Sequence, residues 1–234
     1  MGNGSQGSGR RFEGVRVLMF DLDGTLIDSK RDLALSVNAT LRHMGRETLA
    51  DETIYTYVGN GAQVLVQRAL GEGVTPAEIE KGHAYFLAYY RAHMLDNTAP
   101  YPGVREGLEL LKDRQLAVLT NKPVRFSEAI LAGLGLAGYF RYVYGGNSFA
   151  TKKPEPEGVY ALLEHFAAEP HEAMMVGDSE VDVRTARNSG TWACGVSYGL
   201  GLDGLRAHPP DILLDSLVEL PRHLDEVETV KRAT

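Results

Sequence analysis

The sequence predicts an α/β protein, with a parallel sheet flanked by helices and a helical segment inserted after the first strand. Three features indicate this class. A short apolar run at 15–20 ends at two aspartates, residues 28–98 show helical patterns without a convincing strand, and strand-like and helix-like segments alternate from there on. Because such alternation builds a parallel sheet covered on both faces, we predict a core of residues 15–27 and 99–234, with residues 28–98 as the insert.

The composition is that of a packed protein without a preference for nucleic acid. Of the 234 residues 44% are hydrophobic, and the net charge of −7 disfavours binding to a phosphate backbone. Residues 1–14 are rich in glycine and serine and predict a flexible tail. No apolar run reaches the roughly 18 residues of a membrane span, so we expect a cytoplasmic protein without a membrane partner. The single cysteine, Cys194, is interpreted as a buried apolar side chain.

The first strand and first helix are predicted from short local patterns. Residues 15–20 are apolar and bounded by turn residues, which is typical of a buried strand. Residues 33–44 follow with helical periodicity, and either Asp28 or Ser29 is placed to cap that helix. We therefore interpret Asp28 as a cap at the start of the insert, not as a catalytic group.

Two more helices are predicted in the insert. One begins after Gly61 and runs through an apolar stretch that ends at about residue 70. The other begins at Thr75, with Pro76 in its first turn and Glu78 as the partner of the capping threonine. Both patterns favour a small helical bundle.

Beyond residue 99 the chain alternates between strands and helices. The strands are near-continuous apolar runs, as expected when both faces of a sheet are covered. The predicted strands lie at 116–121, 142–146, 173–178, 191–199 and 211–216, and the predicted helices at 103–114, 124–135, 156–167, 181–190 and 217–227.

Polar residues follow several of these strands where the strands end. Asp21 and Asp23 follow the first strand, Thr120 and Asn121 the second, and Asp178 a later one. Ligands of open parallel sheets bind at the carboxyl ends of the strands, so we expect these side chains to meet at one edge. Carboxylates there suit Mg²⁺, and a carboxylate can also attack phosphorus to form an aspartyl-phosphate.

Four motifs in this order resemble the haloacid dehalogenase superfamily of phosphohydrolases. They are "DLDGTLID", "LTN", "KKPEP" and "VGDSEVDVRTARNSG", and together they extend over the whole predicted core. The resemblance implies a Rossmann-like core, an α-helical cap formed by the insert, and Mg²⁺ as the cofactor. It also implies hydrolysis of phosphate monoesters.

The resemblance assigns roles to the first two motifs. Asp21 resembles the nucleophile and a metal ligand. Asp23 resembles the general acid and base, with its backbone carbonyl on the metal. Thr120 and Asn121 resemble the residues that hold the transferring phosphoryl group. Gly24 is expected to leave room for the backbone to approach that phosphate.

The third and fourth motifs supply a lysine and two further acids. Lys153 resembles the lysine that offsets the charge of the nucleophile and phosphate, with Lys152 as the alternative in the neighbouring register. Asp178 resembles a metal ligand. Asp182 resembles its partner on the helix, which steadies the lysine or a water bound to the metal.

Three segments, 57–70, 197–201 and 210–221, resemble phosphoglycolate phosphatases. This resemblance implies 2-phosphoglycolate as the substrate, with a loop of Gly59, Asn60 and Gly61 facing the site. Arg68 either adds positive charge there or is an exposed helical residue. The alternatives are a pyrophosphatase, a sugar-phosphate phosphatase, a β-phosphoglucomutase-like enzyme or, less favoured, a non-catalytic binding protein. We expect a small phosphorylated metabolite as the partner, and a monomer or homodimer.

Overall fold

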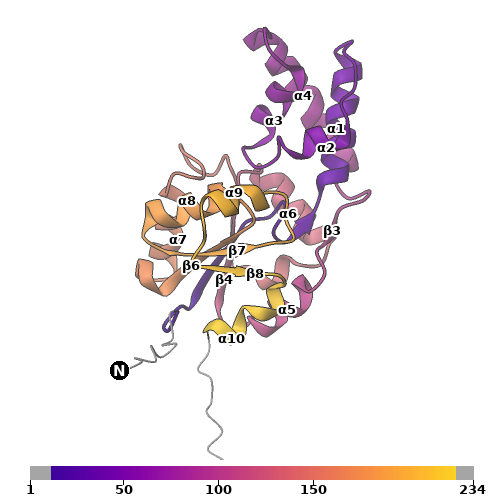
Figure 1. Ribbon diagram of the computed structural model, residues 1–234. Coiled ribbons are helices and arrows are strands. Elements are labelled where there is room, and N and C mark those ends of the chain that lie inside the picture. Colours follow the sequence, from indigo (N-terminus) through magenta and orange to yellow (C-terminus); the bar gives the residue numbers. More distant parts are fainter. Residues whose placement is uncertain (1–11, 225–234) are drawn as a thin grey trace, which may run out of the picture.

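The protein, described here by a computed structural model over residues 12–224, contains one parallel six-stranded sheet (Figure 1). The strand order is β5-β4-β1-β6-β7-β8, and each neighbouring pair is parallel. This confirms the predicted α/β class. The strands are β1 (Val17–Phe20), β4 (Gln115–Leu119), β5 (Tyr142–Tyr144), β6 (Ala173–Gly177), β7 (Trp192–Val196) and β8 (Ile212–Leu214).

Both faces of the sheet are buried under helices. In β1, Leu18 and Phe20 pack into one apolar cluster, whereas Val17 and Met19 pack into a second cluster on the opposite face. The alternation follows from the period of two along a strand. The first cluster includes side chains from α5 (Val104–Leu110), α6 (Val124–Gly133) and α10 (Pro221–Leu224). The second includes side chains from α7 (Glu157–His165), α8 (Glu180–Ser189) and α9 (Leu202–Ala207).

The inserted segment consists of four helices that lie together beyond one end of the sheet (Figure 1). The predicted capping of the fourth helix is confirmed, because the Thr75 hydroxyl accepts from the Glu78 N–H while the Glu78 carboxylate accepts from the Thr75 N–H. The second helix was not predicted. The boundaries of this segment as a separate domain stay a prediction. The helices are α1 (Lys30–His43), α2 (Asp51–Tyr55), α3 (Ala62–Leu70) and α4 (Pro76–His93).

A short ribbon marks the place where the chain enters and leaves the insert. Strand β2 (Ile27–Asp28) pairs antiparallel with β3 (Ala99–Pro100), and neither was predicted. Beside the ribbon, Asp32 is 1% exposed and accepts four hydrogen bonds of 2.7–2.9 Å from the backbone and side chains of Asn97 and Thr98. These bonds fasten the returning chain to the first turn of α1.

The helix predicted at 217–227 is wrong over its described part. A 3₁₀ turn, Leu217–Glu219, is followed by the separate helix α10. Pro221 has no N–H to donate to the carbonyl of Leu217, so that carbonyl accepts from the N–H of Leu220 instead. Residues 225–227 of that prediction, and most of the predicted tail 1–14, lie outside the described residues.

Within residues 12–224, none of the helices has the length and apolar character needed to cross a membrane.

We expect Asp32→Ala to lower the free energy of unfolding by about 2–4 kcal/mol, because it leaves buried donors without their acceptor. Urea unfolding measures this change. Asp203→Ala is the matched control, since the Asp203 side chain is 96% exposed, and it should change stability by less than about 0.5 kcal/mol. Equal effects of the two substitutions would contradict the role given to Asp32.

Candidate active site

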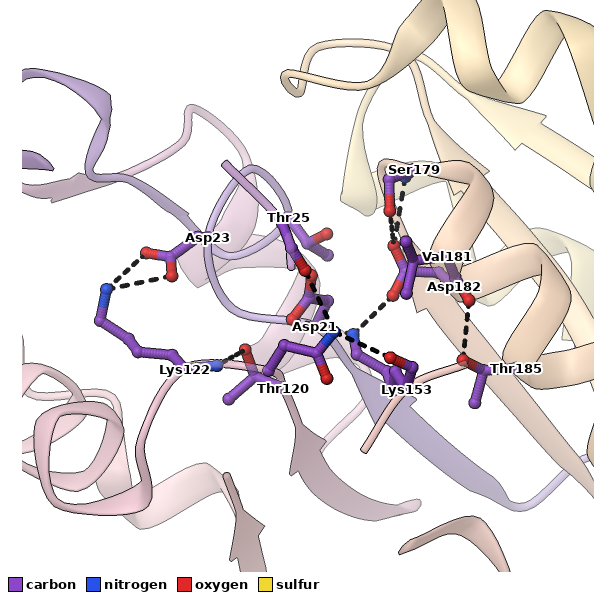
Figure 2. A network of polar contacts seen from close by, with 12 residues as sticks. Asp21, Asp23, Thr25, Thr120, Lys122, Lys153, Ser179, Val181, Asp182 and Thr185 are labelled. Atoms are coloured by element: carbon purple, nitrogen blue, oxygen red, sulfur yellow. Dashed lines mark hydrogen bonds and ion pairs between the residues drawn. The ribbon is translucent and has the colours of Figure 1, made fainter. Parts of the chain in front are cut away.

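The predicted polar residues meet at the carboxyl ends of three adjacent strands. Asp21 follows β1, Thr120 follows β4 and Asp178 follows β6, and the sheet order places β1 between the other two. All three side chains are buried. Figure 2 shows Asp21 at the centre of this group, between Thr120 and the first turn of α8. Parallel topology thus brings residues more than 150 positions apart in the sequence to one edge.

A buried lysine connects two of the acids. The Lys153 ammonium lies 3.0 Å from Asp21 Oδ1 and 2.6 Å from Asp182 Oδ1 (Figure 2). Asp182 also closes the capping box of α8 by accepting from the hydroxyl and N–H of Ser179. Lys152, the alternative lysine, is exposed and donates to the carbonyl oxygen of Asn60. The geometry therefore favours Lys153 over Lys152 as the lysine of the site.

Three carboxylates form a group suited to a cation. One oxygen each of Asp21, Asp178 and Asp182 lies within 4.8 Å of the others, and all three residues are buried. Asp178 accepts hydrogen bonds from the Thr25 hydroxyl and from the Leu200 N–H. The inner oxygen of Asp21, Oδ1, faces Lys153 but has no hydrogen bond of good geometry within residues 12–224. Such crowded oxygen ligands fit a hard divalent ion such as Mg²⁺.

Gly24 is required here for a reason that the sequence did not indicate. Its φ of +89° lies in the region that favours glycine, and a Cβ at this position would collide with the carboxylate of Asp178. We expected the missing side chain to make room for phosphate. The structure gives a nearer cause, which is the close approach of the two motifs. A role of Gly24 in binding phosphate stays a prediction.

Burial raises the pKa of two acids in the cluster. Burial is the main cause for Asp21, whose pKa is raised to about 6 despite the opposing charge of Lys153. Burial, together with the charges of Asp182 and Asp21, raises the pKa of Asp178 to about 8. Without a cation, neighbouring carboxylates in a dry site bind protons more readily than in water.

The carboxylate of Asp23 lies apart from this cluster. Both of its oxygens lie 3.0 Å from the ammonium of Lys122, and one accepts from the Ser29 hydroxyl at 2.5 Å. In Figure 2, Asp23 and Lys122 lie on the opposite side of Asp21 from Asp182.

The predicted cap residue Ser29 makes no side-chain capping bond, whereas Asp28 accepts from the N–H of Lys30.

The predicted loop of the insert contacts the core at this edge. The Asn121 amide donates to the carbonyl oxygens of Gly59 and Lys153, at 3.1 and 3.0 Å. Gly61 lies close to Asn121, where an added Cβ would be 3.2 Å from its carbonyl oxygen. Arg68, by contrast, is exposed and donates to the carbonyl of Tyr57 away from the acids. Arg68 therefore adds no charge to this site.

Two hollows meet at Asp21 and Asp23 between the core and the insert. One, of about 160 Å³, extends toward Asp178 and is bordered by the loop at Gly59 and Asn60. The other extends toward α4 and α6. Its lining combines Thr120, Asn121 and Lys122 with the apolar and aromatic side chains of Leu33, Leu65, Phe86, Tyr90 and Phe126.

Comparisons with known proteins agree with this geometry. The family model described as haloacid dehalogenase-like hydrolase matches residues 18–196. A phosphoglycolate phosphatase of Pseudomonas putida is 38% identical over 86% of this chain and 77% of its own length. One from Colwellia psychrerythraea is 37% identical, over 87% and 94%. A crystal structure of a predicted phosphoglycolate phosphatase from Haemophilus somnus has a TM-score of 0.84 and 33% identity, covering 89% of this chain and 97% of that one.

The sheet, the acids at its edge and these matches define the class of the protein, which is a hydrolase with an acidic centre at the ends of parallel strands. The chain belongs to the haloacid dehalogenase-like hydrolases. Within that family it is a phosphatase.

We expect Mg²⁺ to stabilise the protein more at about pH 8.5 than at about pH 5.5. The pKa values of Asp21 and Asp178 are raised from 3.8 to about 6 and about 8. The folded, metal-free protein therefore keeps protons that the unfolded chain has lost, and its stability falls as the pH rises through this window. Mg²⁺ competes with protons for the same oxygens, so the gain in Tm on adding Mg²⁺ should grow with pH.

Thermal unfolding with and without Mg²⁺ at the two pH values measures this difference. Asp178→Asn should remove most of the dependence on pH, and Asp203→Asn should leave it unchanged. A Tm gain that is the same at both pH values in the natural sequence would contradict the assignment of these acids to a cation site.

Proposed function

We propose that the protein is a Mg²⁺-dependent phosphatase of 2-phosphoglycolate that acts through an aspartyl-phosphate at Asp21. The observation that carries this proposal is the position of Asp21, buried at the end of the central strand between Lys153 and Thr120. The names of the relatives, phosphoglycolate phosphatases over most of the chain, favour the substrate.

The first half of the reaction forms the covalent intermediate. A carboxylate oxygen of Asp21 attacks phosphorus while the bond from phosphorus to the glycolate oxygen breaks. The leaving oxygen takes a proton from the carboxyl group of Asp23, which lines the same two hollows as Asp21. The charge of Lys153 lowers the pKa of Asp21 against the larger effect of burial, which favours the ionised nucleophile.

The second half returns the enzyme to its starting state. Asp23 takes a proton from a water molecule, whose oxygen attacks the phosphorus of the aspartyl-phosphate. The bond from phosphorus to Asp21 breaks, which releases inorganic phosphate and restores the carboxylate. The two halves thus use the same acid first as a proton donor and then as a base.

Other residues of the site hold the phosphoryl group. The Thr120 hydroxyl lies close enough to the carboxylate of Asp21 to lower its pKa, so it lies within reach of a group attached there. Asn121 borders the same cavity, and its amide donates to the carbonyl oxygens of Gly59 and Lys153, which positions both loops beside the phosphoryl group. The loop at Gly59, Asn60 and Gly61 closes the cavity from the insert and reduces access of bulk water.

Asp21 and Asp178, with the backbone carbonyl of Asp23 and with Asp182 beside them, would hold Mg²⁺. When bound, the ion supplies positive charge to the phosphate oxygens and to the crowded acids. Asp182 serves this centre mainly through Lys153, since its two oxygens are engaged by that ammonium and by Ser179.

Asp21→Asn should reduce turnover by at least roughly 10³-fold, because it replaces the attacking oxygen while keeping the shape of the side chain. Phosphate release measures the rate, and circular dichroism checks that the variant is folded. Asp203→Asn serves as a matched control on the surface. Activity of the Asp21 variant close to that of the control would rule out a phosphorylated Asp21.

The substrate is tested by measuring kcat/KM for phosphate release in the presence of Mg²⁺. The panel contains 2-phosphoglycolate, pyrophosphate, hexose phosphates, nucleoside monophosphates and p-nitrophenyl phosphate. We expect 2-phosphoglycolate to exceed the other compounds clearly. A preference for pyrophosphate or a sugar phosphate would keep the chemistry and reject the substrate, and no release from any compound would reject the proposed function.

A further inference from the structure

One buried cation of the site has no part in the mechanism described above. Lys122 is 6% exposed and lines the hollow that extends toward α4 and α6. Among the residues described, it is the only lysine, arginine or histidine in the walls of either hollow at Asp21. Long charged side chains are seldom buried unless they have a partner or a function. Lys122 has such a partner in Asp23, so its charge lies beside the residue proposed to protonate the leaving group.

The position of Lys122 is set by the core and by the insert together. It follows Asn121 in the loop after β4, and its ammonium lies 3.0 Å from both carboxylate oxygens of Asp23. The same ammonium lies 4.6 Å from the centre of the Tyr90 ring on α4. Burial lowers the pKa of Lys122, but the charge of Asp23 and the contact with Tyr90 raise it by more than burial lowers it. The pKa is therefore raised above its ordinary value, and the ammonium stays charged.

A second polar group in the same wall lies beside Lys122. Tyr90 is 1% exposed, and its hydroxyl faces the Lys122 ammonium without a hydrogen bond of good geometry to any described residue. Its ring lies against Phe86 and Phe126, which also line the hollow. A buried hydroxyl without a partner is costly, whereas a ligand oxygen placed here would satisfy it. The hollow thus offers one ammonium and one neighbouring hydroxyl within apolar walls.

We propose that Lys122 and Tyr90 together recognise a carboxylate on the leaving group of the substrate. The inference rests on the proposed function and goes further by assigning the residues that select an acidic phosphate ester. Lys122 is a specificity-determining residue that contacts the substrate, and Tyr90 adds a hydrogen bond.

The chemistry of 2-phosphoglycolate explains why the cation must lie beside Asp23. The oxygen that leaves phosphorus is joined through one carbon to the carboxylate, so the carboxylate lies only a short distance beyond the acid that protonates that oxygen. Lys122 touches Asp23 directly and therefore reaches this position. Apolar walls weaken competition from water, which makes the contact between opposite charges count for more. The same walls limit the size of the leaving group.

The test compares 2-phosphoglycolate with 2-phosphoglycolamide, a substrate of the same shape with a neutral amide in place of the carboxylate. The natural enzyme should prefer the carboxylate in kcat/KM. Lys122→Met should reduce that preference by roughly 10- to 100-fold, because a hydrogen bond to a charged group is lost. Lys122→Arg should keep part of the preference, and Tyr90→Phe should cause a smaller loss in the same direction.

The ratio of the two substrates is the measurement, because Lys122→Met also removes the partner of Asp23 and can slow both reactions. Lys81→Met, the same change at an exposed residue of α4, is the matched control and should leave the ratio unchanged. Equal values of kcat/KM for the two compounds in the natural enzyme, or an unchanged ratio in folded Lys122→Met, would overturn the inference.

The proposed function and this inference fail in different ways. If the natural enzyme hydrolyses p-nitrophenyl phosphate but does not prefer 2-phosphoglycolate to 2-phosphoglycolamide, only the role of Lys122 and Tyr90 is rejected. If no phosphate ester is hydrolysed by the natural enzyme, the proposed function is rejected and the inference with it. If Lys122→Met does not fold, the ratio of kcat/KM for the two substrates in the natural enzyme and in Lys122→Arg still tests the inference.

Discussion

The pairing of Lys153 with Asp21 and Asp182 is the contact on which the rest of the site depends. Parallel strands deliver Asp21 and Asp178 to the same dry edge, where burial alone would favour their neutral forms. Lys153 contacts two of the three acids and is itself buried. A buried lysine and buried acids each carry a large desolvation cost, and only their proximity offsets it. Lys153 neutralises part of the negative charge, and the fold therefore tolerates an acidic centre. The negative charge that remains can bind a cation.

The same constraint explains how tightly the motifs approach one another. Gly24 has no side chain because the carboxylate of Asp178 occupies the space. The Asn121 amide joins the loop of the insert to the loop that carries Lys153. At the other end of the insert, Asp32 holds the returning chain against α1. The Asn121 contacts thus attach the insert to the core beside the cavity, and the Asp32 bonds hold the two ends of the insert together. Insert side chains such as Phe86 and Tyr90 also share one apolar cluster with the sheet.

Much of this arrangement could be predicted from the sequence, because strand periodicity and motif order are local signals. These signals placed the sheet and the ends of its strands. They also placed four residues of the site, which are Asp21, Thr120, Lys153 and Asp178. Lys122 was not, because a lysine after Asn121 has the pattern of an exposed loop residue, and its burial depends on Tyr90, which lies 32 positions earlier in the printed sequence. The two-residue strands β2 and β3, and the five-residue helix α2, are too short to show a period.

The position of Lys122 changes the expected division of labour between core and insert. By resemblance, the insert was expected to place a loop of Gly59, Asn60 and Gly61 at the site, and Arg68 was its candidate cation. Arg68 lies away from the acids, and the cation in the cavity comes from the core, two residues after Thr120. The insert contributes Tyr90 and apolar walls. These walls exclude water, which strengthens the attraction between Lys122 and an opposite charge. In the proposed enzyme, one loop of the core therefore supplies both the Thr120 hydroxyl for the phosphate and the Lys122 ammonium for the substrate carboxylate. The distance between the two groups is fixed by this loop, and a substrate is selected by whether its phosphate and carboxylate fit that distance. The insert then acts by enclosing this pair, and a substrate too large for the enclosed space is excluded by size instead of by charge.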